Sequence, residues 1–487
     1  MYLSYFSPEA WTSWEISAKP VIPAGMPVLV DDDLLFEDPA GQRRTVLVNR
    51  WLRELPASGC PSPRSWEYYA RVLRDWMAFL AGIDVDLCDE RAALKGALSA
   101  YADHRAAGPL EARFEVSTWN QHVSILSAFY RWAVAEGHAR AEPFTYKAAT
   151  VIYADQVRTQ AVNLASRRAP KPHVTVKHLE GDFAELFLKG LRGLAPDGEE
   201  DRSFRGRDLG RNAAIGGLAL ATGLRLQEFT YLLSYEIPPL PSRRTSLPIA
   251  FPVPSGVTKG RKFRTTWISY EALAAVHQYL ELDRAVVAEG SGWRPPRGWG
   301  GPLTVTDPDH RGGRVNGVRV RWEVLTPAER RRLVAAEGGA CLLALKSRGG
   351  PFTAWSTVFE RTSERIRQRW EPRFPHVHPH RLRHSFSLRT LELLVSGYYR
   401  QAAKLVAATD TDAALALYLA KADPLMVLRD LLGHSSVRTT ESYLRRLDMT
   451  RVYQDAYRSV GEEEGLLDPD ELVREVAEEF ADEEGEN

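Results

Sequence analysis

One short segment of the chain concentrates imidazole and guanidinium groups. Residues 376–384 read HVHPHRLRH, which holds four of the chain's 12 histidines together with two arginines. Two kinds of chemistry use such a combination. Neutral imidazole is the commonest metal ligand. Arginine instead offers a planar set of donors for a phosphate, beside which histidine can donate or accept a proton near neutral pH. The segment therefore predicts either a metal site or a phosphate site.

The spacing within this segment favours a phosphate. Pro379 suits the first position of a helix, so His380 and Arg383, three residues apart, would share one face near the helix N-terminus. That end carries unpaired backbone N–H groups and the positive pole of the helix dipole, which favour an anion over a metal cation. His380 and His384 have the spacing of a zinc-binding helix, but Arg381 stands where the zinc-protease motif has glutamate. A histidine-cluster metallohydrolase is thus the weaker alternative.

Two further segments contain residues capable of chemistry. In LLGHSSVRTTESYLRRLD, Gly433 and His434 end one predicted helix and Tyr443 follows nine residues later on the next. Tyrosine is a covalent nucleophile in a minority of enzymes, and a lone tyrosine on a helix more often belongs to the core or the surface. In TGLRLQEF, Arg225 lies on an otherwise apolar predicted helix and must be paired there. A structural ion pair with Glu228 is one interpretation, and a second guanidinium aimed at the same phosphate is the other.

Composition indicates an ordinary soluble globular protein. The 487 residues are enough for two or three domains, and 44% are hydrophobic and 26% charged. The three cysteines are far apart and odd in number, which argues against a disulfide framework or a cysteine metal site. We find no signal-like N-terminus and no apolar run of the roughly 20 residues that a membrane span needs. We therefore expect a cytoplasmic protein without a membrane anchor.

Charge is unevenly distributed although the formal net charge is zero. Residues 461–487 contain 13 acidic residues and one arginine, which leaves 62 basic and 50 acidic residues in the rest of the chain, a net charge of +12. A basic body with an acidic tail suits a polyanionic partner such as nucleic acid, but proteins without such a partner show the same imbalance. Charge alone does not decide between these two interpretations.

The elements that must position these residues form two predicted units. Apolar residues at three- and four-residue spacing predict helices over 65–82 and 118–136, and these define a compact all-α unit. The second unit is mostly helical, with a short strand pair around PVPSGVTKGRKFRTTWIS. The predicted divisions are a loosely structured lead-in over 1–59, the helical unit over 60–148, a linker over 149–175, a second unit over 176–458 with an insertion at about 290–339, and an acidic tail over 459–487 with a short amphipathic helix.

Together these motifs resemble those of the tyrosine recombinase (phage integrase) family. Their order and spacing are the family's, and several matching motifs are more specific than any one. The resemblance covers most of residues 60–450, with the helical unit similar to the family's core-binding domain and the second unit to its α+β catalytic domain. The insertion and the long stretch between Arg383 and Gly433 depart from the family pattern. The motifs are ATGLRLQEF with Arg225, TKGRKFRTTWIS with Lys259, HRLRH with His380 and Arg383, LLGHSS with His434, and TTESYL with Tyr443.

The resemblance implies a site-specific DNA recombinase or integrase with type IB topoisomerase-like chemistry. Tyr443 would attack the scissile phosphodiester and form a 3′-phosphotyrosine, while Arg225 and Arg383 stabilise the developing charge. His380 would accept the tyrosine proton, and His434 would hydrogen-bond the phosphate.

Lysine would supply the proton for the leaving 5′-oxygen. Lys259 is the residue implied by the resemblance, and Lys262 on the same turn is its rival. Arg261, Lys262, Arg264 and Arg381 are expected to contact DNA, whereas His376 and His378 are interpreted as incidental.

The implied partners are double-stranded DNA with specific recombination sites and further copies of the chain in a tetramer, with room for an accessory DNA-bending or directionality factor. No metal or other cofactor is expected, and the protein is expected to be associated with the nucleoid. Integration, excision or transposition of a mobile element is the expected role. A DNA-binding protein that kept the fold and lost catalysis is the main alternative.

Overall fold

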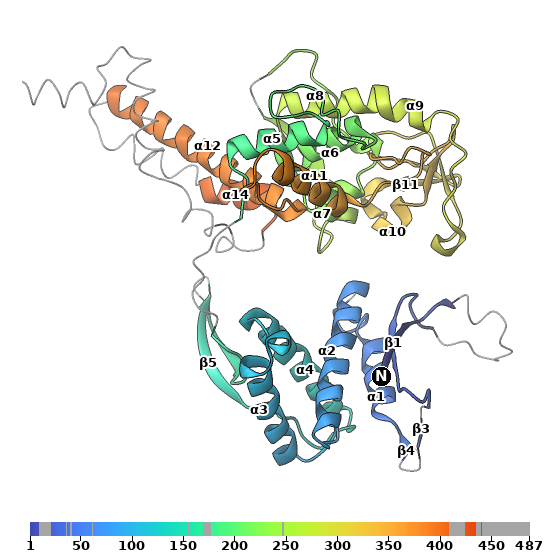
Figure 1. Ribbon diagram of the computed structural model, residues 1–487, viewed down its shortest axis with the longest axis vertical. Helices are drawn as coiled ribbons and strands as arrows, with labels where there is room; N and C mark the ends of the chain where they lie inside the picture. Colours follow the sequence, from blue (N-terminus) through green and yellow to red (C-terminus); the bar gives the residue numbers. More distant parts are fainter. Residues whose placement is uncertain are drawn as a thin grey trace, which may run out of the picture. The chain divides into compact units, whose positions relative to one another are not determined.

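The chain divides into two compact units, residues 1–173 and residues 174–487. Both units are mainly helical with small sheets, which confirms the predicted fold class (Figure 1). The computed structural model describes residues 1–8, 21–35, 37–38, 41–60, 62–153, 156–168, 177–245, 248–408, 424–434 and 440.

The part of the first unit that the structure describes contains four α-helices. The predicted helices over 65–82 and 118–136 are present as α2 and α4, each 20 residues long. The helices are α1 (Arg44–Glu54), α2 (Pro63–Gly82), α3 (Arg91–Ala107) and α4 (Val116–Ala135). The strands form antiparallel pairs: β1 (Tyr2–Tyr5) with β2 (Pro27–Val30), β3 (Glu37–Asp38) with β4 (Gly41–Gln42), and β5 (Tyr146–Tyr153) with β6 (Gln156–Asn163).

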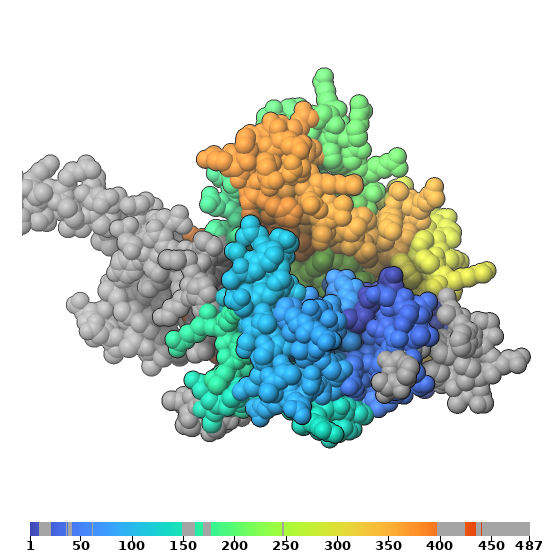
Figure 2. Space-filling model, turned by 60° about the horizontal axis from the view of Figure 1, so that its bottom comes forward, coloured from blue at the N-terminus to red at the C-terminus, as the bar shows by residue number. Residues whose placement is uncertain are grey.

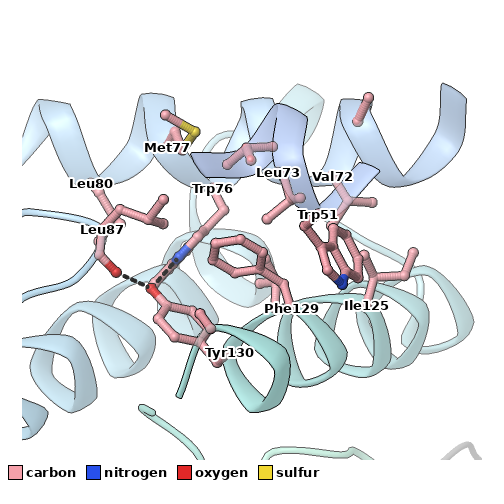
Figure 3. Packing of buried hydrophobic residues seen from close by; sticks show 14 of the residues in the cluster. Trp51, Val72, Leu73, Trp76, Met77, Leu80, Leu87, Ile125, Phe129 and Tyr130 are labelled. Carbon is pink, nitrogen blue, oxygen red and sulfur yellow. Dashed lines mark hydrogen bonds between the residues drawn. The ribbon is translucent and has the colours of Figure 1, made fainter. Parts of the chain in front are cut away.

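Large aromatic side chains fill the space between α2 and α4 (Figure 3). The indole N–H of Trp76 donates to the hydroxyl of Tyr130 at 3.0 Å, and that hydroxyl donates to the carbonyl of Leu87 at 2.9 Å. Both polar atoms are therefore satisfied inside an apolar core, as buried donors and acceptors require.

Residues 1–59, interpreted from the sequence as a loosely structured lead-in, contribute ordered elements to this core. Trp51 of α1 stacks on Tyr69 with ring centroids 5.7 Å apart and meets Phe129 edge-on. Figure 2 shows the dark blue surface of these residues adjoining the lighter blue of α2 to α4. At 11 residues α1 gives a weaker periodic signal than the 20-residue helices. The lead-in residues buried in the core are Met26, Leu29, Thr45, Val48, Trp51, Leu52 and Leu55.

The largest core of the second unit is formed by helices together with a strand pair. Its centre includes Phe187, Ile215, Phe229 and Trp355, all fully buried. The helices are α5 (Gly181–Leu191), α6 (Leu209–Thr222), α7 (Leu226–Thr230), α8 (Tyr270–Tyr279), α9 (Ala285–Ala288), α11 (Trp355–Arg369), α12 (Pro379–Ala408) and α14 (Pro424–Leu432). The predicted strand pair is present as β7 (Ile249–Val253) and β8 (Arg264–Ile268).

The insertion at about 290–339 folds into a small sheet that packs on the rest of the second unit. The four-stranded sheet has the order β11-β10-β9-β12. The fully buried guanidinium of Arg330 donates to both carboxylate oxygens of Glu236, at 2.6 and 2.8 Å, which fastens the insertion to the segment after α7. The elements are β9 (Leu303–Thr306), β10 (Gly312–Val315), β11 (Val318–Arg321), α10 (Pro327–Arg330) and β12 (Leu333–Ala335).

Candidate active site

Arg225 begins a helix instead of lying in the middle of one. Helix α6 ends at Thr222, and Gly223 follows in the left-handed conformation with φ of 62°. Arg225 is then the residue before α7, so the single apolar helix predicted through this region is wrong, because the glycine terminates it. The backbone N–H of Arg225 donates to Glu228 Oε2 at 2.7 Å, and its Nη1 donates to Oε1 at 3.0 Å. The ion-pair interpretation is confirmed.

This pairing leaves the guanidinium of Arg225 partly accessible. Its side chain is 31% exposed, whereas that of Glu228 is 1% exposed. Its Nη2 lies 3.5 Å from the carbonyl oxygen of Gly433. The guanidinium of Arg225 thus pairs with Glu228 on one side and is accessible on the other. Arg225 can therefore form the ion pair and still bind a phosphate.

Glu228 binds a second arginine from β8. Nη1 and Nη2 of Arg264 each donate to one carboxylate oxygen of Glu228 at 2.7 Å. Burial raises the pKa of the Glu228 carboxyl, but the hydrogen bonds and charge of Arg264 and the contacts from Arg225 outweigh burial, so the pKa is lowered. The side chain of Arg264 is only 8% exposed, because its guanidinium donors are bound to oxygens inside the protein. The contact with DNA expected for Arg264 stays a prediction.

Arg383 lies deeper and joins three motifs. Pro379 is the first residue of α12, as predicted, and Arg383 lies one turn further on. Its side chain is buried, with Nη1 donating to the carbonyl of Gly223 and Nη2 to the carbonyl of Leu432, both at 2.6 Å. These carbonyls belong to the ends of α6 and α14. The segments that carry Arg225, Arg383 and His434 therefore meet at one place.

His380 and His434 both lie in the field of these arginines. Partial burial, then the charges of Arg383 and Arg225, lower the pKa of His380. Partial burial and the charges of Arg383, Arg225 and Arg264 lower the pKa of His434 to about 4. Nδ1 of His434 lies 3.0 Å from the hydroxyl of Thr440. Both imidazoles are accordingly neutral at pH 7 when no anion is bound, so each combines one N–H donor with one nitrogen able to accept a proton.

The candidate lysines lie at the tip of the β7–β8 hairpin. Lys259, Arg261 and Lys262 are all exposed there. Gly260 and Arg261 have φ values of 79° and 53°, and the hydroxyl of Thr258 donates to the carbonyl of Lys262 at 2.9 Å. The turn is thus closed by its own residues and presents its cations outward. This geometry fits both lysines equally.

Other residues of the histidine-rich segment have structural contacts. Arg381, expected to contact DNA, is 8% exposed, and its buried Nε has no hydrogen-bond partner among the residues that the structure describes. His378 precedes α12 and accepts from the backbone N–H of Arg381 through its carbonyl at 2.9 Å and its Nδ1 at 3.3 Å, so it caps the helix. His384 packs edge-on against His380 at 4.3 Å between ring centroids, and partial burial lowers its pKa to about 4.

Tyr443 lies outside the described residues, as does the predicted tail over 459–487. Within the described ranges we find no group of three or more His, Cys, Asp or Glu side chains placed to hold a metal ion. None of the helices described has the length and apolar character needed to cross a membrane.

Sequence reasoning therefore found four residues that the structure brings together, namely Arg225, His380, Arg383 and His434. It treated Glu228 as a partner of Arg225 alone and missed the bridge to Arg264. The sequence gives little indication of the Glu228–Arg264 contact, because the two residues are 36 positions apart and only the tertiary structure brings them together.

Comparison with known proteins matches residues 48–137 to the phage integrase N-terminal SAM-like domain. No curated protein sequence matches the chain. Among solved structures, the XerA recombinase is 17% identical, covers 86% of this chain and 98% of its own, and has a TM-score of 0.31. The XerH site-specific recombinase bound to difH substrate is 14% identical, with coverages of 84% and 83% and a TM-score of 0.41. The Tn1549 transposon integrase in complex with transposon right end DNA is 14% identical, with coverages of 83% and 99% and a TM-score of 0.45.

Proposed function

We propose that this protein, whose residues 48–137 belong to the phage integrase N-terminal SAM-like domain family, is a site-specific tyrosine recombinase that cleaves and rejoins double-stranded DNA. One observation carries the proposal. The buried guanidinium of Arg383 donates to the ends of both α6 and α14, at 2.6 Å each, and so assembles Arg225, His380 and His434 from three distant segments around one point. Two arginines and two neutral histidines suit a phosphodiester.

The arginines supply the electrostatic part of the reaction. A phosphodiester carries one negative charge, and more charge develops on its non-bridging oxygens as a nucleophile attacks. Arg225 is anchored by Glu228, so its position is set before DNA binds. A preorganised donor of this kind is worth roughly 3–4 kcal/mol in the transition state. Arg383 adds a second positive charge, although its present hydrogen bonds to Gly223 and Leu432 mean that it acts chiefly through charge and through holding the site together.

Proton transfer is divided between a neutral histidine, which accepts a proton, and a charged lysine, which donates one. His380, whose pKa is lowered by partial burial and by the charges of Arg383 and Arg225, accepts the proton of the Tyr443 hydroxyl as that oxygen bonds to phosphorus. The bond from phosphorus to the 5′-oxygen breaks, and Lys259 protonates this oxygen. His434 donates a hydrogen bond to the phosphate. The product is a 3′-phosphotyrosine with a free 5′-hydroxyl, which conserves the bond energy for rejoining and needs neither nucleotide nor metal.

The proposed partners are specific duplex DNA sites and other copies of the chain. Strand exchange between two duplexes uses four cleavage events, so we propose a tetramer on DNA, assisted where needed by an accessory DNA-bending or directionality factor. The proposed role is integration, excision or transposition of a mobile element, with the protein associated with the nucleoid.

A nicked DNA substrate tests the proposal, because cleavage beside a nick releases a short piece and traps the covalent adduct. The wild-type protein is expected to form an adduct on a denaturing gel in EDTA and without nucleotide. Tyr443→Phe should bind the same DNA with near-normal affinity and form none. Activity that disappears with chelator and returns with zinc would instead favour a histidine-cluster metallohydrolase. Binding without cleavage by the wild type would favour a DNA-binding protein that lost catalysis.

A further inference from the structure

Arg264 on β8 contacts two of the segments that form the candidate active site. Its Nη1 and Nη2 donate to the carboxylate of Glu228 at 2.7 Å each, and its Nε donates to the carbonyl of Leu431 at 3.2 Å. Glu228 in turn holds Arg225, whereas Leu431 lies near the end of α14, just before His434. One side chain thus joins the segment of Arg225 to the segment of His434.

This contact is buried, which distinguishes it from an ordinary surface ion pair. The side chain of Glu228 is 1% exposed and that of Arg264 is 8% exposed, so each charge would be costly without the other. All three guanidinium nitrogens of Arg264 donate to protein oxygens. Lysine cannot reproduce this bidentate geometry.

The contact between Arg264 and Glu228 affects phosphate binding, because it changes the net charge around Arg225. If Glu228 had Arg225 as its sole partner, its carboxylate would cancel the positive charge that the phosphate requires. With Arg264 also bound, Glu228 and its two arginines carry one net positive charge between them. Arg225 can therefore be oriented by a carboxylate and still attract an anion.

The same contact reaches the hairpin that carries the candidate general acid. Arg264 is the first residue of β8 and lies five residues after Lys259. Its stem also lies against Gly433, where an added Cβ would stand 2.8 Å from Arg264 Cδ. Arg264 therefore connects the base of the lysine turn to Glu228 and to the end of α14.

We propose that Arg264 is a positioning residue, which balances the charge of Glu228 so that Arg225 remains a phosphate ligand and which fixes the lysine hairpin against the end of α14. This inference rests on the recombinase function proposed above. It predicts that the harm done by losing Arg264 comes largely from the uncompensated carboxylate of Glu228.

A double-variant test on the full-length protein addresses that prediction. The proteins compared are the wild type, Arg264→Met, Arg264→Met with Glu228→Gln, and Arg244→Met as a control. Arg244 makes an exposed ion pair with Glu271, the two side chains being 77% and 59% exposed. DNA affinity is measured by gel shift, and the rate of covalent-adduct formation is measured on nicked DNA.

Arg264→Met is expected to slow adduct formation about 100-fold, the scale of losing one preorganised cation, with DNA affinity little changed. Adding Glu228→Gln should restore about tenfold of that rate, because it removes the charge that Arg264 had balanced. Arg244→Met should match the wild type.

The possible results distinguish a failure of the proposed recombinase function from a failure of the role assigned to Arg264. No adduct with wild-type protein would refute the proposed function itself. A wild-type rate for Arg264→Met, or equal impairment of the single and double variants, would overturn the role of Arg264 while leaving the function in place. If Arg264→Met does not fold, Arg264→Lys decides: slower cleavage at unchanged DNA affinity supports the proposal, and wild-type cleavage overturns it.

Discussion

At the scale of single residues, this chain shows how a charged site can be built inside a protein. Arg225, Arg264 and Arg383 all use backbone carbonyls or Glu228 as partners. Partial burial, and then the charges of these arginines, lower the pKa of the neighbouring His434 to about 4. The motif residues were identifiable from the sequence because each lies at a characteristic spacing from its neighbours. The pairing of Glu228 with Arg264 was not, since spacing along the chain carries no information about a contact between distant residues.

The two lysines of the hairpin provide a prediction at this scale. Lys259→Ala is expected to slow cleavage by about 10²–10⁴-fold, the usual contribution of a general acid, and much more than Lys262→Ala. A substrate with sulfur in place of the bridging 5′-oxygen should restore the rate of the Lys259 variant, because a thiolate leaves without a proton donor. If the sulfur-containing substrate restored the cleavage rate of the Lys262 variant alone, Lys262 would be the general acid in place of Lys259.

At the scale of elements, helix ends position the site. Helix α6 ends before Gly223, α12 starts at Pro379 and α14 ends before Gly433, and each end presents carbonyls or side chains to the arginines. The start of α12 and the β7–β8 hairpin were predicted correctly, since proline and turn residues mark them. The end of α6 was missed because the apolar pattern continues through Gly223, and a left-handed glycine within such a pattern is visible only in the structure.

Gly433 gives the prediction at this scale. Its φ of 63° is left-handed, and an added Cβ would lie 2.8 Å from Cδ of Arg264, which is pinned by Glu228. Gly433→Ala should therefore lower the free energy of unfolding by about 1–2 kcal/mol and slow cleavage.

Gly217→Ala is the matched control for that variant. Gly217 lies within α6 with its nearest neighbour atom 4.0 Å from an added Cβ, so alanine should stabilise the helix by about 0.5–1 kcal/mol. Thermal and urea unfolding measure both variants. Equal stability of Gly433→Ala and the wild type would contradict the strain assigned to this turn.

At the scale of the whole molecule, the segment interpreted as a loosely structured lead-in and the segment interpreted as an insertion both contribute to cores. Residues 1–59 supply Trp51 and its buried neighbours to the first unit. The insertion supplies Trp322 to the second unit, together with Arg330, which pairs with Glu236 outside the insertion. Their Pro-, Gly- and Arg-rich sequences conceal this, because short strands and an 11-residue helix bury few residues each. Domain boundaries depend on such long-range packing, which periodicity does not show.

Truncation tests the role of the N-terminal residues. A fragment of residues 1–173 is expected to unfold cooperatively, whereas a fragment of residues 60–173 should be largely unfolded. The buried residues removed include Trp51, Leu52 and Val48, and each is worth about 1.5–3 kcal/mol, which together approaches the whole stability of a domain. Circular dichroism during heating decides it, and equal melting temperatures for the two fragments would show that the N-terminal packing is dispensable.

Identification of the residue that carries the nucleotide tests the central claim most directly. Wild-type protein is trapped on a nicked substrate, the DNA is digested, and the tryptic peptides are sequenced by mass spectrometry. The account predicts that the nucleotide is attached through phosphate to Tyr443 and that the released DNA end is a 5′-hydroxyl. A nucleotide on any other residue, or cleavage that leaves no nucleotide on the protein, would contradict it.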